Sequence, residues 1–211
     1  MFIMIEMIIS RTAQLVVGSA YKAWKGKQVR ELQKILLEEI SEKNTLIHVE
    51  DVDDQITLME MFYEAKRTGA ANENLRLMAR ALRGMAAKGQ PVYPNKFRKY
   101  ARILAELRFE EILVLAAFYK MNKQMLAEVE GTVSAGKVTV HSLWMRVEGE
   151  VVPGFLSAAD MASAAYSCQR HGLLIPDITI DNIGFLKPTP LLDELVEIAD
   201  MQDFPIDPES L

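Results

Sequence analysis

Residues 157–192 read SAADMASAAYSCQRHGLLIPDITIDNIGFLKPTPLL, and this stretch decides the fold of the C-terminal part of the chain. Ser157 is a good N-cap, which predicts a helix that runs to about His171 and stops at Gly172. Beyond it, Ile178 and Ile180 alternate with polar residues, and turn-forming residues follow them. This pattern predicts one short β-hairpin whose second strand resumes at residues 185–186.

The end of the same stretch predicts a last helix. Thr189 is a capping residue, and Pro190 stands where proline is favoured, at the first helical position. The apolar residues Leu191, Leu195 and Ile198 recur at helical spacing, which indicates a buried face. Residues 201–211 are expected to form an acidic tail with frayed structure.

Hydrophobic periodicity predicts further helices upstream of this stretch. They cover Thr12–Ser41, Asp51–Lys66, Ala71–Lys88, Pro94–Leu107, Glu110–Met125 and Thr139–Val152. Asp51 is expected to cap its helix, and the helix that starts at Glu110 is apolar on nearly all sides, so it should be buried. Residues 138–152 are ambiguous, because Val138 and Val140 also alternate as in a strand; we favour the helix. The small residues of 131–136 form a linker and a candidate boundary zone.

Two short motifs resemble a known family. A helix ending in Gln169–Leu174 (QRHGLL), a hairpin, and then Phe185–Leu192 (FLKPTPLL) is similar to the recognition-helix, wing and last-helix order of winged-helix domains. Leu107–Leu113 (LRFEEIL) fits the opening helix of that family. The order from about Asp51 onward also resembles bacterial proteins of the abortive-infection Abi-alpha type, which have a helical region followed by a winged-helix-like end.

The resemblance implies a mainly α fold: an N-terminal helical bundle over residues 1–108, a winged-helix-like region with one short β-hairpin over 109–200, and the acidic tail. It does not carry DNA reading with it. A recognition helix needs donors and positive charge toward phosphates and bases, whereas residues 157–171 offer only Gln169, Arg170 and His171 at one end. Winged helices also serve as protein-interaction modules.

Charge is distributed unevenly along the 211 residues. The net charge is −5, but residues 1–128 hold 20 Lys/Arg against 16 Asp/Glu, while residues 129–211 hold 4 against 13. Such asymmetry is a clue about partners, including each half as a partner of the other. Cys168 is the only cysteine, so no internal disulfide can form, and we expect a cytoplasmic protein.

Met1–Ala20 is apolar but is interrupted by Glu6, Arg11 and Gln14. Its longest uncharged stretch, Thr12–Tyr21, is too short for a membrane span. The first charge is acidic, unlike that of a signal peptide. We expect a helix packed on the core or in a dimer; an amphipathic helix on a membrane surface is the alternative that the sequence disfavours.

Positive charge concentrates between Arg76 and Arg108. The candidate partner-binding residues in this segment are Arg76, Arg80, Arg83, Arg98, Lys99 and Arg102. One interpretation is a footprint for anionic lipid or for the phosphate backbone of a nucleic acid, the latter bound by helices 76–83 and 96–102. The other is a solvated face, or a surface that docks the acidic C-terminal half.

Catalytic and metal motifs are absent from the sequence. Cys168 and His171 lie three residues apart and could form a thiolate–imidazole pair, but Cys168 falls on the apolar stripe of its helix. Glu110 and Glu111 point about 100° apart, so they predict a helix start rather than a carboxylate pair. His48, His141 and His171 lack zinc-ligand spacing, and the acidic cluster at 50–54 lacks the pattern of a calcium loop.

These observations predict a non-enzymatic protein-interaction or regulatory protein without a cofactor or metal. Its partner would be another protein or a second copy of the chain. The alternatives are a nucleic-acid-binding protein that uses the basic helices, and an enzyme with a site that the sequence does not reveal.

Overall fold

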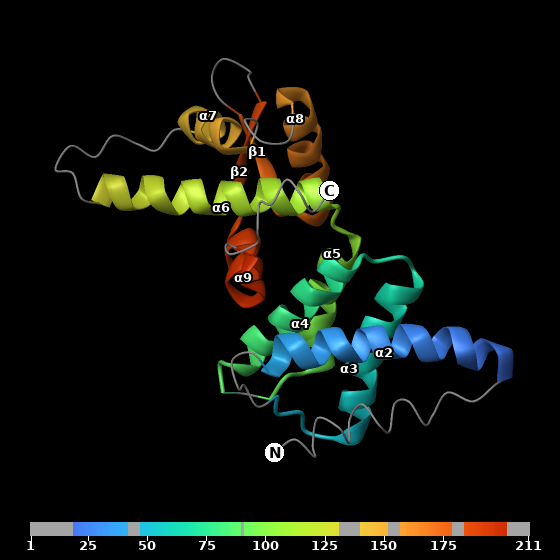
Figure 1. The fold of residues 1–211 in the computed structure, drawn as a ribbon. Coiled ribbons are helices and arrows are strands. Elements are labelled where there is room, and N and C mark those ends of the chain that lie inside the picture. Colours follow the sequence, from blue (N-terminus) through green and yellow to red (C-terminus); the bar gives the residue numbers. More distant parts are fainter. Residues whose placement is uncertain are drawn as a thin grey trace. The chain divides into compact units, whose positions relative to one another are not determined.

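A computed structural model describes residues 19–41, 47–89, 91–130, 140–151, 157–178 and 184–201 (Figure 1). The described part is mainly helical and has one antiparallel two-stranded hairpin, which confirms the predicted fold class. The chain divides into two compact units, unit 1 (Met1–Glu106) and unit 2 (Leu107–Leu211). The sequence predicts this boundary after residue 108, two residues further along the chain.

Unit 1 is a bundle of four described helices: α2 (Ser19–Ser41), α3 (Val52–Arg67), α4 (Asn72–Ala86) and α5 (Pro94–Glu106). Helix α4 packs against α2 and α5, and α3 packs against α5 and α2. Asp51 caps α3 as predicted, because its side chain accepts a hydrogen bond from the backbone N–H of Asp54 at 2.7 Å. Phe62 of α3 stacks on Phe97 of α5 at 5.7 Å between ring centroids, and both are fully buried in the core of the unit.

Unit 2 contains α6 (Phe109–Glu130), α7 (Val140–Val151), α8 (Ala158–Ser167), the 3₁₀ helix η2 (Cys168–His171), the strands β1 (Leu174–Ile178) and β2 (Gly184–Pro188), and α9 (Pro190–Ala199). Helix α6 contacts α7, α8, α9 and β2, and α7 contacts α8 and β2. Residues 111–119 of α6 are all buried, as its apolar sequence predicted. This helix therefore forms the centre of the unit.

The predicted caps of unit 2 are confirmed. Ser157 and Asp160 form a capping box at the start of α8, and Thr189 accepts a hydrogen bond from Leu192 N at the start of α9. Gly172 adopts a positive φ of 69°, which ends η2 and turns the chain into β1. Residues 140–151 form a helix, so the favoured alternative for this ambiguous segment is correct.

The structure differs from the expectations at several boundaries. Strand β1 begins at Leu174, before the predicted Ile178, and it includes Pro176 opposite Leu186. Proline is tolerated there because both strands of a two-stranded sheet are edge strands. The α-helical part of 157–171 ends at Ser167, and its last turn tightens into η2. Helix α6 continues past Met125 to Glu130. The predictions for residues 1–18, 131–139, 152, 179–183 and 202–211 lie outside the described residues.

Candidate functional site

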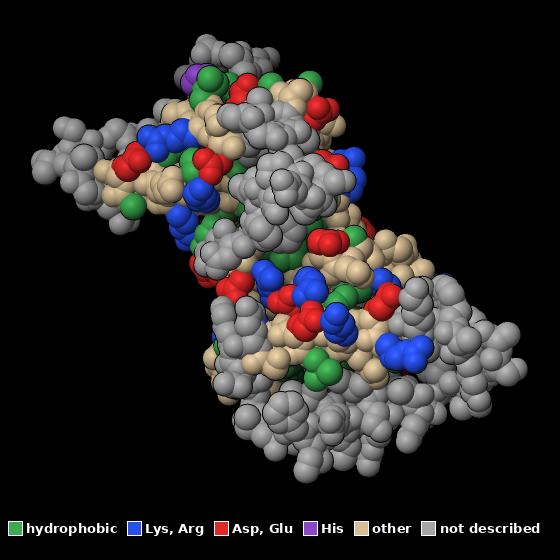
Figure 2. All heavy atoms as spheres, viewed as in Figure 1, with side chains coloured by type: hydrophobic (Ala, Val, Ile, Leu, Met, Phe, Trp, Pro, Cys, Tyr) green, Lys and Arg blue, Asp and Glu red, His purple; other side chains and the backbone are tan. Residues whose placement is uncertain are grey.

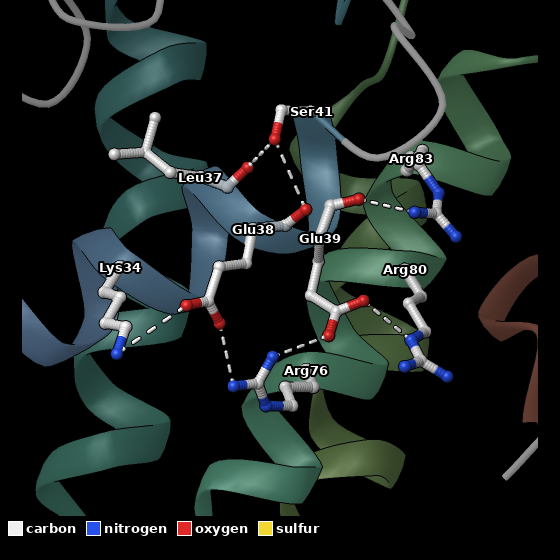
Figure 3. A network of polar contacts seen from close by, with 8 residues as sticks. All are labelled: Lys34, Leu37, Glu38, Glu39, Ser41, Arg76, Arg80 and Arg83. Carbon is white, nitrogen blue, oxygen red and sulfur yellow. Dashed lines mark hydrogen bonds and ion pairs between the residues drawn. The ribbon is translucent and has the colours of Figure 1, made fainter.

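Three arginines of α4 meet two glutamates of α2 in unit 1 (Figure 3). Arg76 donates to Glu39 Oε1 at 2.9 Å and to Glu38 Oε2 at 2.8 Å, and Arg80 Nε donates to Glu39 Oε2 at 2.7 Å. Arg83 donates to the main-chain oxygen of Glu39. We call these five residues the Glu39 cluster. All three α4 arginines predicted to bind a partner are thus engaged within unit 1.

The helical spacing explains this cluster. Positions 76, 80 and 83 recur at steps of four and three, so they lie on one face of α4. Glu38 and Glu39 stand in the last turns of α2, where backbone carbonyls have no partner further along the helix. Arg83 supplies a donor to one of these carbonyls and is only 3% exposed. The sequence predicts Arg83 on an exposed basic face. In the structure its side chain is buried and binds a main-chain carbonyl near the C-terminal end of α2.

Glu39 is ionised in this environment. Burial alone would raise the pKa of its carboxyl, but hydrogen bonds from Arg80 and Arg76 outweigh that effect and lower the pKa below its usual value. Figure 2 shows the result at the surface, where basic and acidic side chains lie side by side over the part of unit 1 in which α2 and α4 meet. The positive charge of α4 is therefore largely compensated by α2.

Helix α5 keeps an exposed basic surface, which we call the α5 face. Its cations are Lys96, Arg98, Lys99 and Arg102. Each of the two lysines lies about 5.5 Å from the centroid of a tyrosine ring, and Arg102 makes a 3.4 Å contact with Glu106. Arg98 forms no ion pair with the residues that the structure describes. Exposed pairs of this kind contribute little to stability, so these cations remain available to an anion.

A groove runs between α3 and α5 beside the α5 face. Its volume is about 690 Å³. Arg98 and Arg102 of α5 line it together with Glu60 and Glu64 of α3. Ala101 and other small residues form much of the rest of the lining. The mixed charge of this groove does not suit a phosphate group, whose binding needs positive charge and donors together.

Unit 2 holds a second buried carboxylate, which we call the Glu111 clamp. Glu111 of α6 is 0% exposed, and Arg170 of η2 binds it through two nitrogens at 2.6 and 2.8 Å. Arg108 adds two side-chain bonds at 3.1 Å and donates its backbone N–H at 2.9 Å. The clamp links the start of α6 to the 3₁₀ helix η2.

The clamp keeps Glu111 ionised. Burial alone would raise the pKa of this carboxyl, but hydrogen bonds from Arg170, from the backbone of Arg108 and from Ser167 lower it to about 2. Sequence reasoning recognised Glu111 only as a helix-start residue. Its bond to the backbone of Arg108 is part of that role, because a glutamate at the third helical position often reaches back to the N-cap. No local signal indicated Arg170, 59 residues away.

The cysteine and histidine at the end of α8 do not form an activated pair. Cys168 is fully buried, and its thiol donates to the carbonyl of Ala164 at 3.2 Å. Burial, together with the negative charge of Glu111, raises the pKa of the Cys168 thiol to about 12. A thiol with this pKa is protonated at neutral pH and is a poor nucleophile.

Two further searches concern metals and membranes. Within the described residues, no three or more His, Cys, Asp or Glu side chains lie in an arrangement that could hold a metal ion. None of the described helices combines the length and the apolar character that crossing a membrane requires. Comparisons of the chain with protein-family models, with curated proteins and with solved structures gave no match.

Proposed function

We propose that the chain is a non-enzymatic protein-interaction module whose unit 2 is a winged-helix-like domain adapted to bind protein rather than DNA. The order of three helices, hairpin and last helix supports this assignment. Helices α6, α7 and α8 pack on one another, and the hairpin follows α8 after the short helix η2. In this arrangement α8 takes the place of the recognition helix.

The surface of α8 is the observation that carries the proposal. Its exposed side chains are Ala158, Ala159, Asp160, Ser163 and Tyr166, which together carry one negative charge. Arg170, which follows in η2, is bound by Glu111 and Ser167. A helix that reads DNA must bring positive charge and hydrogen-bond donors to phosphates and base edges. A helix with net negative charge is instead repelled by the DNA polyanion, which opposes binding. A helix face without positive charge that presents one exposed tyrosine suits a protein surface better.

Photo-crosslinking from α8 tests this function. The full chain, carrying p-benzoylphenylalanine at Ser163, is irradiated in the cells that produce the protein. We expect a discrete protein adduct, because Ser163 is one of the exposed residues of this α8 face. A matched chain with the same group at Glu194 on α9 is expected to give no such adduct. Adducts with nucleic acid at Ser163, or equal adducts from both positions, would overturn the proposal.

A second candidate function is polyanion binding by the α5 face. The observation that favours it is the exposure of four cations within seven residues of one helix, two of them beside tyrosine rings. Phosphate backbones bind such surfaces through counterion release. This candidate is narrower than the basic site expected from the sequence, because the arginines of α4 are held by α2.

Fluorescence anisotropy with a labelled duplex and a labelled single strand tests this candidate. If the α5 face binds DNA, the triple variant R98Q/K99Q/R102Q is expected to lower the slope of log affinity against log salt by about 3 for the duplex, roughly 0.9 per lost contact. The control variant K120Q/K123Q/K187Q removes the same charge from unit 2 and should leave the slope unchanged. Absence of binding at low salt, or equal losses in both variants, would exclude this function.

A further inference from the structure

A continuous set of aromatic rings joins α7, α8 and β2 in unit 2. His141 lies 4.9 Å from Phe185 between ring centroids, and Trp144 lies 6.1 Å from Phe185 and 6.3 Å from Tyr166. We call these four residues the aromatic strip. Behind it, Trp144 meets the buried ring of Phe118 edge-on at 5.8 Å, which fixes the indole against the core.

The strip reaches the surface. His141 is exposed, Tyr166 is 47% exposed, and Trp144 and Phe185 are half-buried. Met145, next to Trp144 on α7, is 53% exposed. Aromatic and methionine side chains that are anchored on one side and open on the other are enriched at protein interfaces. Contacts between neighbouring rings link all four members of the strip.

An acidic side chain without a described ion pair stands on the helix that carries the strip, while the cations of unit 2 are paired. Each lysine and arginine of unit 2 whose side chain the structure describes forms an ion pair within the unit: Arg108, Lys120, Lys123, Arg146, Arg170 and Lys187. Glu148, by contrast, makes no ion pair with the described residues. It follows Trp144 by four positions on α7, so the carboxylate and the indole share a face of the helix.

We propose that the aromatic strip and Glu148 bind a lysine- or arginine-bearing segment of a partner protein. A cation is attracted to the faces of aromatic rings, and a carboxylate one turn away adds a charge-assisted hydrogen bond. An acidic partner would meet uncompensated negative charge, and a purely apolar partner would leave Glu148 without a counter-charge. This inference rests on the proposed function, because it names the partner class of the same α7–α8 surface.

The test uses the full chain and two fluorescein-labelled peptides of twelve residues. One alternates Lys and Arg with Gly and Ser, and the other carries Glu in place of each cation. We expect the cationic peptide alone to bind. Glu148→Gln and Tyr166→Lys should each weaken this binding by about fivefold or more, in line with the strength of a cation–π contact. Tyr166→Phe keeps the ring and should stay within about twofold of the parent chain.

A charge-matched control separates site binding from general attraction. Glu194→Gln on α9 removes the same charge as Glu148→Gln but lies outside the strip, and it should leave the affinity unchanged. Absence of binding by the parent chain, or equal losses in the two variants, would overturn the inference. A concentration-dependent dimer in sedimentation that Glu148→Gln abolishes would place a second copy on the strip and also overturn it. A protein adduct from Ser163 together with any of these results would leave the proposed function standing.

Discussion

Replacing Glu39 with alanine is expected to lower the free energy of unfolding of unit 1 by about 2–3 kcal/mol, because breaking a buried ion pair strands the remaining charges. The side chain of Glu39 is 5% exposed and serves Arg76 and Arg80 at once. Both arginines can recover part of their hydration, which keeps the loss below the upper end for fully buried pairs.

Urea unfolding followed by circular dichroism measures this loss, and amide hydrogen exchange assigns it to α2 and α4. Glu38→Ala is the matched control, because Glu38 is the neighbouring residue, binds the same Arg76 and is much more exposed. It should cost less than a third of the Glu39→Ala effect, since exposed ion pairs contribute little. Equal losses from the two variants would contradict a buried role for Glu39.

Replacing Arg170 with methionine is expected to destabilise unit 2 by about 3 kcal/mol at pH 7, because a fully buried carboxylate would keep only one of its two arginines. Methionine retains most of the apolar stem of arginine, so the loss reports mainly the charge. Arg146→Met is the matched control. Arg146 also grips a carboxylate with two nitrogens, at 2.9 Å each to Glu128, but on the exposed surface. It should cost far less.

The Arg170→Met effect is expected to depend on pH in a definite direction. In the parent chain the pKa of Glu111 is lowered to about 2 on folding, from an ordinary value of 4.5. Its contribution to stability is therefore complete above pH 4.5 and is lost as the pH falls toward 2. In the variant the buried carboxyl binds a proton more readily, so the difference between the two chains should shrink below pH 4.5. Urea unfolding at several pH values measures it, and a difference that grows on acidification would contradict the assignment.

Local signals predicted the start of several elements, because capping depends on residues a few positions apart. Asp51, Ser157 and Thr189 each accept the backbone N–H expected of an N-cap. The helix over 140–151 could also be favoured from spacing alone. The start of β1 could not, because Leu174 and Pro176 enter the strand through pairing with β2, and proline is disfavoured in strands.

The sequence does not predict which residues form ion pairs with the charged side chains. A periodic pattern places Arg76, Arg80 and Arg83 on one face of α4, but it says nothing of the helix that covers that face. The glutamates that bind them lie 37 to 44 positions away. Their pairing depends on how α2 packs, so the sequence predicted an open basic surface where the structure has a compensated one. The α5 face, which no described helix covers in this way, is the part of the predicted site that stays exposed.

The buried thiol of Cys168 can report how often unit 2 opens. It is the only cysteine in the sequence, and it is sealed in unit 2 with a pKa of about 12. A thiol-selective alkylating reagent can therefore react at Cys168 only, and only in molecules whose unit 2 has opened. The rate of adduct formation, followed by mass spectrometry, therefore measures the opening of unit 2 without an engineered probe.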